Sequence, residues 1–402
     1  MGDTYADEDT GFHYLRVDNI GANGTIAGKM KWLTESTYKT LERYRIFSGD
    51  VLISIAGTIG RIAVFDETNT STPTILNENC AKLHIGEEVL PGYLMLLLLS
   101  CPLQKQMVRD YIQTTIPKLG LDRIRQLRLP PIPKVAEQEQ VIAAWDLELK
   151  KFLDANLKAV LLLDSIEDYL LAELGISLPP EPENALASRI FTAQRRELAG
   201  WRFDPQALHP EREACIAELQ RQPLHPLRKA ASFCRDLRTE IPEGAVYVGL
   251  ENIESNTGRY IPSNDKESVS SAFAFRKGQV LFPKLRPYLN KVFLAPFDGL
   301  CSTEFHVLEG ITIRSEFLAL FLRSNLVVKQ TKHLMSGNTL PRLQTEDIET
   351  LLIPEVDDLV QQRIIGKAEY WMAEAERLRT EAQTELEAAK RRIEAMLLGD
   401  PA

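Results

Sequence analysis

The chain has 402 residues, of which 44% are apolar, and a formal net charge of −9. This length allows two or three domains with their own cores, and no apolar run is long enough to span a membrane. The five cysteines are scattered without a metal-ligand spacing, which predicts reduced thiols in a cytoplasmic protein and argues against disulfides or a bound metal.

The negative charge is concentrated in two segments. Residues 135–187 carry 3 Lys/Arg against 11 Asp/Glu, and residues 357–402 carry 7 against 10. These segments sum to −11, so the rest of the chain carries +2. Salt screens exposed charges beyond about 10 Å, and a locally basic surface can therefore bind a polyanion. Acidity of the whole chain does not exclude a nucleic-acid partner.

In chain order, five segments are expected. Residues 1–134 and 223–356 contain short β-branched and aromatic runs separated by Gly, Pro and Asn, each followed by an apolar helix, which predicts two α+β domains. Residues 135–178 and 357–402 are expected to be long helices, and residues 179–222 a Pro-rich linker with a short connector helix.

The long helices have apolar residues at alternating spacings of three and four, as in a coiled coil. In the first helix these are Ile142, Trp145, Leu149, Phe152, Ala159, Leu163, Ile166 and Leu170, with Asn156 at the one polar position. The second has a similar stripe rich in Ala. We expect the helices to pair antiparallel as an arm of roughly 60 Å between the domains. The alternative is two separate amphipathic helices, each packed on its own domain.

The two domains repeat the same motifs. "TTIPKLGLDRIRQLRLPPIP" (114–133) matches "NTLPRLQTEDIETLLIPEV" (338–356), and "YLRVDNI" (14–20) matches "YVGLENI" (247–253). Three further motifs match in the same order, with an offset that drifts only from 233 to 223 residues. Such ordered self-similarity predicts an internal duplication.

No catalytic motif is present. The sequence lacks a phosphate-binding Gly-rich loop, a nucleophile elbow, a zinc-protease motif and the Asx-Pro-Pro-aromatic motif of amino-group DNA methylation. The six histidines form no cluster in the sequence. An enzymatic activity of the chain alone is therefore not expected.

Basic loops are the remaining candidates for function, because Lys and Arg neutralise phosphates while Arg and Asn can read bases. Residues 103–134 have a local charge of +5, and "FPKLRPYLNKVF" (282–293) contains no acid. In the second domain we predict phosphate contacts by Lys284, Arg286 and Lys291, base-edge or groove contacts by Tyr288 and Asn290, and backbone positioning by Arg342. Their counterparts in the first domain are Thr58, Arg61, Lys118, Arg123 and Arg125. The alternative interpretation of these loops is an ordinary solvated surface.

Together these motifs resemble the specificity subunit of type I restriction-modification systems, over essentially the whole chain. The resemblance implies two target-recognition domains separated by an antiparallel coiled coil, each reading one half of a split site in double-stranded DNA. It also implies two adenine-methyltransferase subunits as partners, which bring S-adenosylmethionine, and a translocase-nuclease subunit in some assemblies. Trp145 and Trp371 are then candidate partner-interface residues, with packing inside the helix pair as the alternative.

The first domain departs from this plan. Thirteen residues precede Tyr14, whereas the second domain has a lead-in of some forty residues before Tyr247. The first domain is therefore expected to lack an opening helix and strand. Three functions remain open: recognition of both half-sites, recognition of one half-site by a degenerate subunit, and a protein scaffold without DNA binding.

Overall fold

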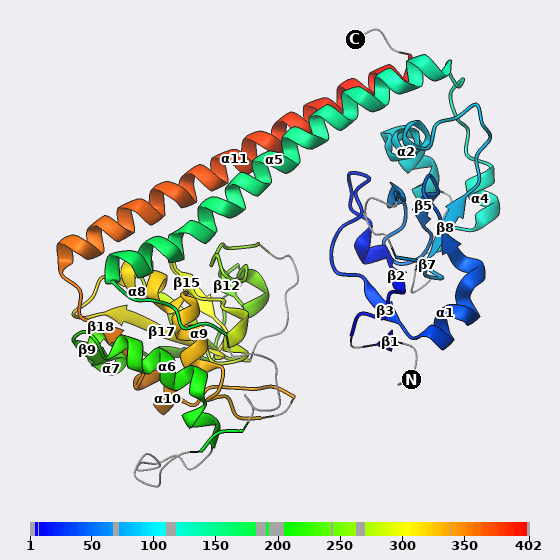
Figure 1. The fold of residues 1–402 in the computed structure, drawn as a ribbon. Helices are drawn as coiled ribbons and strands as arrows, with labels where there is room; N and C mark the ends of the chain where they lie inside the picture. The colour runs from blue at the N-terminus through cyan, green and yellow to red at the C-terminus, as the bar shows by residue number, and fades with distance from the viewer. Residues whose placement is uncertain are drawn as a thin grey trace. The chain divides into compact units, whose positions relative to one another are not determined.

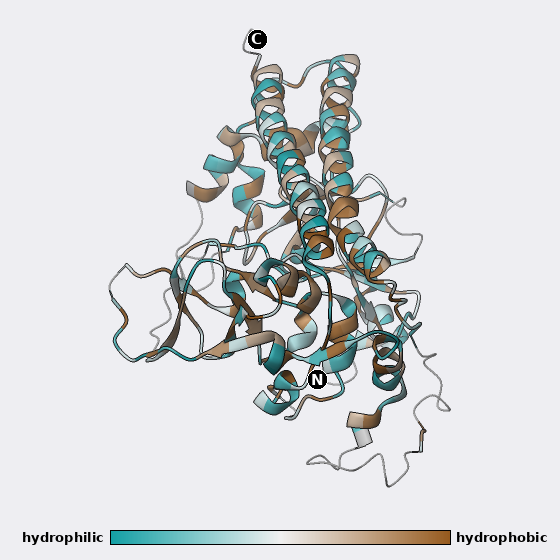
Figure 2. Cartoon of the chain, turned by 90° about the vertical axis from the view of Figure 1, so that its left-hand side faces the viewer, coloured by the Kyte–Doolittle hydropathy of each residue, from teal (hydrophilic) through white to brown (hydrophobic). Residues whose placement is uncertain are grey.

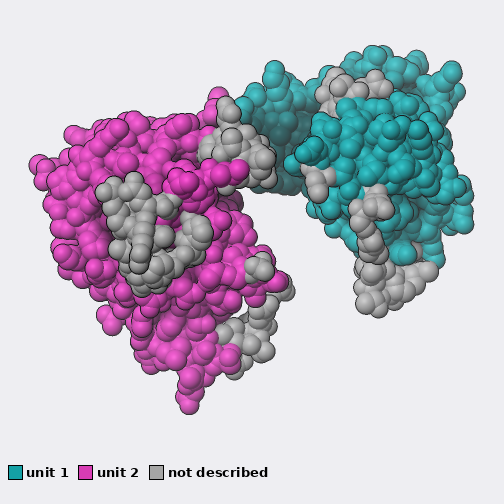
Figure 3. Space-filling view, turned by 60° about the horizontal axis from the view of Figure 1, so that its bottom comes forward, with its two compact units in different colours: residues 1–157, 378–402 teal, residues 158–377 magenta. Residues whose placement is uncertain are grey.

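The computed structural model describes residues 5–6, 8–66, 72–109, 118–181, 190–192, 205–242, 244–262, 270–337 and 339–399. The chain divides into two compact units: unit 1 comprises residues 1–157 and 378–402, and unit 2 comprises residues 158–377 (Figure 3). Each unit thus includes a part of both long helices. No helix in the described ranges combines the length and apolar composition needed to cross a bilayer.

Unit 1 contains two sheets and several short helices (Figure 1). One sheet has the strand order β1-β3-β2-β7-β4, and the other has the order β6-β5-β8. The strands are β1 Tyr5–Ala6, β2 His13–Leu15, β3 Lys31–Leu33, β4 Arg45–Ile46, β5 Val51–Ser54, β6 Ile62–Val64, β7 Thr74–Leu76 and β8 Cys80–Leu83. The helices before the first long helix are α1 Glu35–Leu41, α2 Pro91–Leu99, α3 Cys101–Arg109 and α4 Leu121–Arg125.

Unit 2 repeats this plan with additional elements. Its sheets have the orders β10-β17-β14-β15, β11-β13-β16-β12 and β18-β9. The strands are β9 Leu224–Pro226, β10 Ala231–Cys234, β11 Leu237–Arg238, β12 Tyr247–Val248, β13 Ala272–Phe275, β14 Val280–Pro283, β15 Phe293–Leu294, β16 Gly299–Cys301, β17 Phe305–Gly310 and β18 Leu352–Pro354. The helices are α6 Pro210–Leu219, α7 Leu227–Ala230, α8 Ser315–Leu322, α9 Asn325–Thr331 and α10 Thr345–Glu349.

The duplication is visible in the strand pairing. In unit 1, β5 pairs antiparallel with β6 and β8, while in unit 2 β14 pairs antiparallel with β15 and β17. The "YLRVDNI" strand β2 lies parallel to β7, and its equivalent β12 lies parallel to β16. The expected internal repeat is therefore present as a repeated fold.

Buried asparagines make the same hydrogen bonds in both copies of the DNI/ENI motif. The side chain of Asn19 accepts from the backbone N–H of Arg16 at 3.0 Å and donates to the carbonyl of Ala27. Asn252 accepts from the N–H of Gly249 at 2.8 Å and donates to the carbonyl of Ile261. The motif recurs because a buried amide closes the turn after each strand by satisfying backbone groups.

The long helices are α5 Val135–Leu174 and α11 Asp358–Leu398. Figure 2 shows hydrophilic and hydrophobic residues alternating along both of them. In unit 2, Tyr169 packs on Trp371 and Glu173 pairs with Arg363, an order that makes the helices antiparallel there. In unit 1, Glu148 lies 3.7 Å from Arg392. The predicted apolar stripes are buried at their central positions, including Ala159, Leu170, Ile364, Ala375 and Leu386.

Each long helix begins with a buried glutamine that fastens it to the domain before it. In unit 1, Gln138 accepts from the N–H of Leu90 at 2.8 Å and donates to the carbonyls of Glu88 and Pro133. In unit 2, Gln361 accepts from the N–H of Arg314 at 2.9 Å and donates to the carbonyl of Val356. In both units the glutamine side chain is buried and its amide is held by hydrogen bonds to the backbone. These bonds fix the direction in which the helix leaves the domain.

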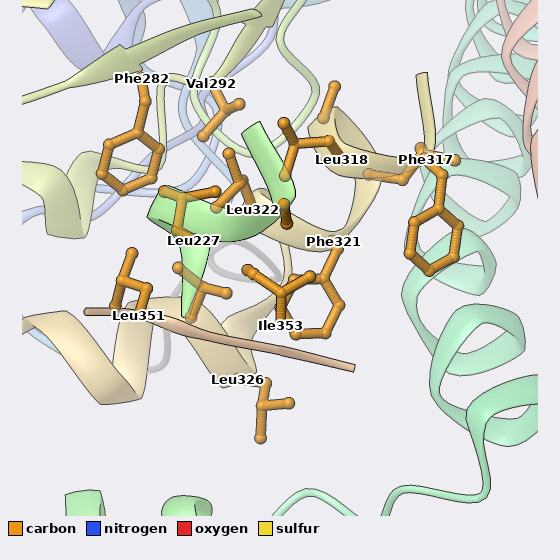
Figure 4. Close-up of a cluster of buried hydrophobic side chains, with 14 of the residues drawn as sticks. Leu227, Phe282, Val292, Phe317, Leu318, Phe321, Leu322, Leu326, Leu351 and Ile353 are labelled. Carbon is orange, nitrogen blue, oxygen red and sulfur yellow. The ribbon is translucent and has the colours of Figure 1, made fainter. Parts of the chain in front are cut away.

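The main core of unit 2 lies between β14 and the helices α7, α8 and α9. Figure 4 shows its aromatic and aliphatic side chains converging from elements far apart in the sequence. Unit 1 has the corresponding core around α2, and there Trp145 is only 3% exposed. Trp145 therefore packs inside unit 1, as the alternative interpretation expected, and its contact with a partner subunit stays a prediction.

Two histidines that are distant in the sequence meet in unit 2. The rings of His209 and His333 stack with centroids 3.7 Å apart, and both lie beside the buried carboxylate of Glu211. The expectation of no histidine cluster is corrected here. Glu211 also binds Lys332 at 2.6 Å and lies 3.6 Å from Lys329. The cluster is therefore an ion-pair network that joins α6 to α9. Because two ammonium groups already lie at the carboxylate, it is a poor site for a metal cation.

Replacing Gln138 by Leu is expected to destabilise the junction of unit 1 by about 1–3 kcal/mol, because three backbone groups lose their partner. The measurement is amide exchange at Leu90, which should accelerate about tenfold or more. Gln140→Leu on the exposed side of the same helix is the matched control, with an expected effect below about 0.5 kcal/mol. Equal effects of the two substitutions would contradict this role.

Candidate nucleic-acid interface

The candidate interface of unit 2 is the loop between β14 and β15, residues 284–292. Its middle is the short helix Pro287–Leu289, flanked by Arg286 and Asn290, which both have left-handed backbones with φ of 47° and 50°. The N–H of Arg286 donates to the carbonyl of Pro341 at 2.9 Å, and that of Leu343 to the carbonyl of Lys284 at 3.0 Å. The loop is therefore held against the second copy of the "TLPRL" motif.

Only some of the predicted side chains point outward from this loop. Arg286 is exposed, and no hydrogen bond or ion pair joins its side chain to another described residue. Tyr288 is 44% exposed. These two side chains can reach a partner without giving up an existing contact.

The other predicted cations are already engaged. The Lys284 ammonium donates to the carbonyl of Thr303 at 2.7 Å, and that of Lys291 to the carbonyl of Leu250 at 2.8 Å. Arg342 forms a two-point ion pair with Glu304, at 3.0 and 2.8 Å. This pairing raises the pKa of Arg342 and, as its largest cause, lowers that of Glu304. These groups contribute positive potential at the loop, but their donors are partly used.

Asn290 is not available for base contacts. It is 5% exposed, and its amide donates to the carbonyl of Arg323 at 2.7 Å and to Asn256. Its left-handed backbone explains the residue type, since Asn tolerates this conformation better than other non-Gly residues. In this structure the Asn290 side chain closes the loop from inside, so the predicted base-edge or groove contact would require these hydrogen bonds to break.

Arg235, which sequence reasoning missed, extends the positive charge of this site. It is exposed just after β10, and it lowers the pKa of Lys284 together with the larger effect of burial. Burial first, and then Lys284 and Arg235, lower the pKa of His306 on β17 to about 3. His306 is therefore neutral at neutral pH, beneath a cluster of cations. The "SFCRDLR" segment showed alternating cations, but nothing in it indicated proximity to the loop.

Unit 1 has the same site with different side chains. Its loop between β5 and β6, residues 55–61, is joined to Lys118 by a bridge from Ala56, as Leu285 is to Arg342 in unit 2. Glycines at positions 57 and 60 have φ of 75° and 82°, where unit 2 has Arg286 and Asn290. The repeat that begins "TIPKL" in unit 1 and "TLPRL" in unit 2 thus places a cation beside each loop. The start of its first copy, residues 114–117, lies outside the described residues.

The predicted residues of unit 1 differ in their exposure and in the contacts that their side chains make. Thr58 and Lys118 are exposed, and Arg61 is half-buried at the end of the loop. Arg125 pairs with Asp122 at 2.8 Å on the surface of α4, and Arg123 lies on the same short helix. The loop and Lys118 are brought together, whereas Arg123 and Arg125 lie on α4.

Comparison with known protein families finds a similarity that is confined to the first part of the chain. Residues 6–154 match the family model "Type I restriction modification DNA specificity domain". The match covers the first recognition domain and the beginning of α5, and this part of the chain is similar to that family. The expected resemblance is confirmed there, and the match includes the loop at 55–61, Lys118 and the first part of α5.

The chain is also similar to individual proteins, and it spans about a third of the length of the curated relative that it matches. The Escherichia coli type I restriction enzyme EcoDI specificity subunit is 26% identical over 144 residues, which is 35% of this chain and 32% of that protein. A solved chain from work on complex assembly and conformational transition of the type I R-M system aligns over 97% of this chain and 92% of its own, with 15% identity and a TM-score of 0.49. The type I restriction-modification S subunit from M. genitalium aligns over 100% and 92%, with 12% identity and a TM-score of 0.44.

Replacing Arg286 by Gly is expected to stabilise the unit 2 loop by about 1 kcal/mol, because Gly adopts a left-handed backbone without strain. The measurement is amide exchange at Leu289 and Asn290. Arg276→Gly, an exposed arginine without positive φ, should instead be neutral or destabilising. Equal destabilisation by both substitutions would show that the Arg286 side chain contributes to loop stability.

His306 should make unit 2 sensitive to acid. Because its folded pKa of about 3 lies below the usual 6.5, the unfolded state binds the proton first. Stability should therefore fall as the pH drops from 6.5 toward 3, by up to about 1.4 kcal/mol per pH unit from this group. His306→Gln should flatten the profile of unfolding free energy against pH in that range. His84→Gln, at an exposed position, is the control and should leave the profile unchanged.

Proposed function

We propose that this chain is the DNA-sequence-recognition subunit of a type I restriction-modification complex and performs no catalysis itself. The observation that carries the proposal is the repetition, in unit 2, of the loop and cation found in the unit that matches the specificity family. Arg286, Arg342 and the adjoining cations would contact phosphates, with Tyr288 in a groove. In unit 1, Thr58, Arg61 and Lys118 would occupy the equivalent places.

The duplication favours a two-part site. Two units with the same scaffold and different loop side chains would read two different half-sites in double-stranded DNA, with the long helices as an antiparallel coiled-coil spacer. A second candidate is recognition of a single half-site by unit 2. It is favoured by Gly57 and Gly60, because unit 1 has no side chain where unit 2 presents Arg286.

The partners in this proposal are two adenine-methyltransferase subunits carrying S-adenosylmethionine, with a translocase-nuclease subunit in the larger assembly. The chain offers two similar hollows for two identical partners. One of about 290 Å³ lies beside Trp145 and Glu394 in unit 1, and one of about 370 Å³ beside Glu167 and Asn290 in unit 2. In unit 1, the carboxylate of Glu394 on α11 accepts a hydrogen bond from the backbone N–H of Cys101, the first residue of α3. In unit 2, the carboxylate of Glu167 on α5 accepts one from the backbone N–H of Asn325, the first residue of α9. Trp371, half-buried against Tyr169, remains a candidate contact.

Arg286→Ala should weaken binding of duplex DNA by the methyltransferase complex about tenfold and flatten the dependence on salt. Each lost phosphate contact reduces the slope of log K against log salt by about 0.9. Lys277→Ala removes an equal charge at the opposite end of β14 and should change neither quantity. An unchanged slope for Arg286→Ala would remove this residue from the interface.

Mapping of N6-methyladenine after co-expression with the methyltransferase distinguishes the candidates. A split motif with a fixed gap would support reading by both units, and a motif with one specified half would support the single-half alternative. Arg286→Ala should then lower methylation at all sites. A stable complex without methylation would contradict recognition and favour a protein scaffold.

A further inference from the structure

The hollow of about 370 Å³ in unit 2 has the composition of a small-molecule site. Its apolar side chains come from both long helices and from α8: Leu163, Ile166, Leu170, Leu320 and Met372. Its polar side chains include Asn290 from the β14–β15 loop and Arg323, which directly follows α8. An apolar wall with a few convergent polar groups is typical of sites that bind small ligands.

The amide oxygen of Asn290 lacks a hydrogen-bond donor at this hollow. The residue is 5% exposed, and its Nδ2 donates to the carbonyl of Arg323 at 2.7 Å and to Oδ1 of Asn256 at 3.2 Å. Oδ1 of Asn290 is buried, and no described residue donates to it. Turning the amide over would not help, because Oδ1 would then face the carbonyl of Arg323. The acceptor therefore needs a donor from a ligand or from water.

The guanidinium of Arg323 has no counter-charge. Its Nη2 donates to the carbonyl of Val292 at 3.2 Å, while its Nε is buried without a partner. No ion pair joins it to a carboxylate within the described ranges, and burial lowers the pKa of Arg323 to about 10. A cation that is removed from water without an anion is unfavourable, so the site favours an anionic group in the hollow.

Unit 1 shows that the repeated fold does not need this cation. Leu99 occupies the equivalent position and lines the equivalent hollow. The serines that follow, Ser100 and Ser324, both donate to the carbonyl three residues earlier, at 2.6 and 2.7 Å. The local structure is thus the same with a neutral side chain. The charge of Arg323 is an addition to the scaffold, and it gives only the hollow of unit 2 a buried donor for an anion.

Carboxylates on α5 restrict what the anionic group can belong to. Asp164 and Asp168 also line the hollow, both are exposed, and neither is hydrogen-bonded or ion-paired to another described residue. The third carboxylate, that of Glu167, has both oxygens bonded to Asn325. These acids repel a ligand with net negative charge, and Arg323 repels one with net positive charge. A ligand that carries one charge of each sign suits both.

We propose that the hollow of unit 2 binds a free α-amino acid with an apolar side chain. The carboxylate would accept from Arg323, the ammonium would donate to Oδ1 of Asn290, and the side chain would lie on Leu320 and Met372. The two charges of an α-amino acid are one carbon apart, which suits two residues that are hydrogen-bonded to each other. Because Asn290 closes the β14–β15 loop, the occupant would also help to hold that loop. This inference does not depend on the proposed function.

The test uses the full chain with carbon-13 in its methionine methyl groups, titrated with L-leucine. The methyl signal of Met372, assigned with Met372→Leu, should shift in a saturable way, whereas that of Met95 on α2 should not. Leucinamide, which lacks the carboxylate, and 2-hydroxy-4-methylpentanoate, which lacks the ammonium, should each bind about tenfold or more weakly. No shift of Met372 up to about 10 mM L-leucine would overturn the proposal and assign both polar groups to water.

Two substitutions make the test specific. Arg323→Leu, which introduces the residue of unit 1, should weaken leucine binding about tenfold or more, and Arg276→Leu, at an exposed position, should not. Unchanged binding by Arg323→Leu would place the ligand elsewhere and overturn the proposal. Asp164→Asn combined with Asp168→Asn should lower the preference for leucine over 2-hydroxy-4-methylpentanoate about threefold or more. An unchanged preference, or tighter binding of the hydroxy acid by the unaltered chain, would assign the hollow to a plain carboxylate and overturn the amino acid.

Discussion

The buried glutamine at the start of each long helix is the constraint on which the arrangement of each unit depends. A helix of forty residues amplifies any error in its starting direction, and a flexible junction would leave that direction undetermined. Gln138 and Gln361 prevent this by joining the helix to the backbone on both sides of the junction, with the amide oxygen and the amide nitrogen each engaged. Burial makes the alternative costly, because a rotated amide would leave unsatisfied groups in the core.

The repeated fold could be predicted from the sequence because it follows from local patterns. The DNI/ENI motifs, the apolar helices and the stripes of the long helices each depend on residues close in the chain, and their order recurs. The partners of each strand could not be predicted, because pairing such as β10 with β17 joins residues about 75 positions apart.

The site was only partly predictable, for a physical reason. Charge counts identify cations but not whether backbone carbonyls are within their reach. Lys284 and Lys291 look equivalent to Arg286 in the sequence, yet both donate to carbonyls of other segments, Thr303 and Leu250. Asn290 was expected to face outward, but its left-handed backbone turns the amide inward to Arg323. Likewise, Trp145 looks suited to a partner, but an apolar stripe can bury a ring as readily as expose it.

The two loops show how a duplicated scaffold can acquire different surfaces. Both turns require left-handed backbones at two positions, and glycine meets that requirement in unit 1 at no steric cost. In unit 2 the same positions hold Arg286 and Asn290, and only the asparagine is compensated by internal hydrogen bonds. Arg286 therefore keeps a strained backbone that a glycine would relieve. The bridges from Ala56 to Lys118 and from Leu285 to Arg342 hold both loops at residues outside the turn. The residues at the left-handed positions can therefore differ between the units while the loops keep the same position. A scaffold held by buried amides and a surface set by turn residues can therefore change independently, as the proposed reading of two different half-sites would require.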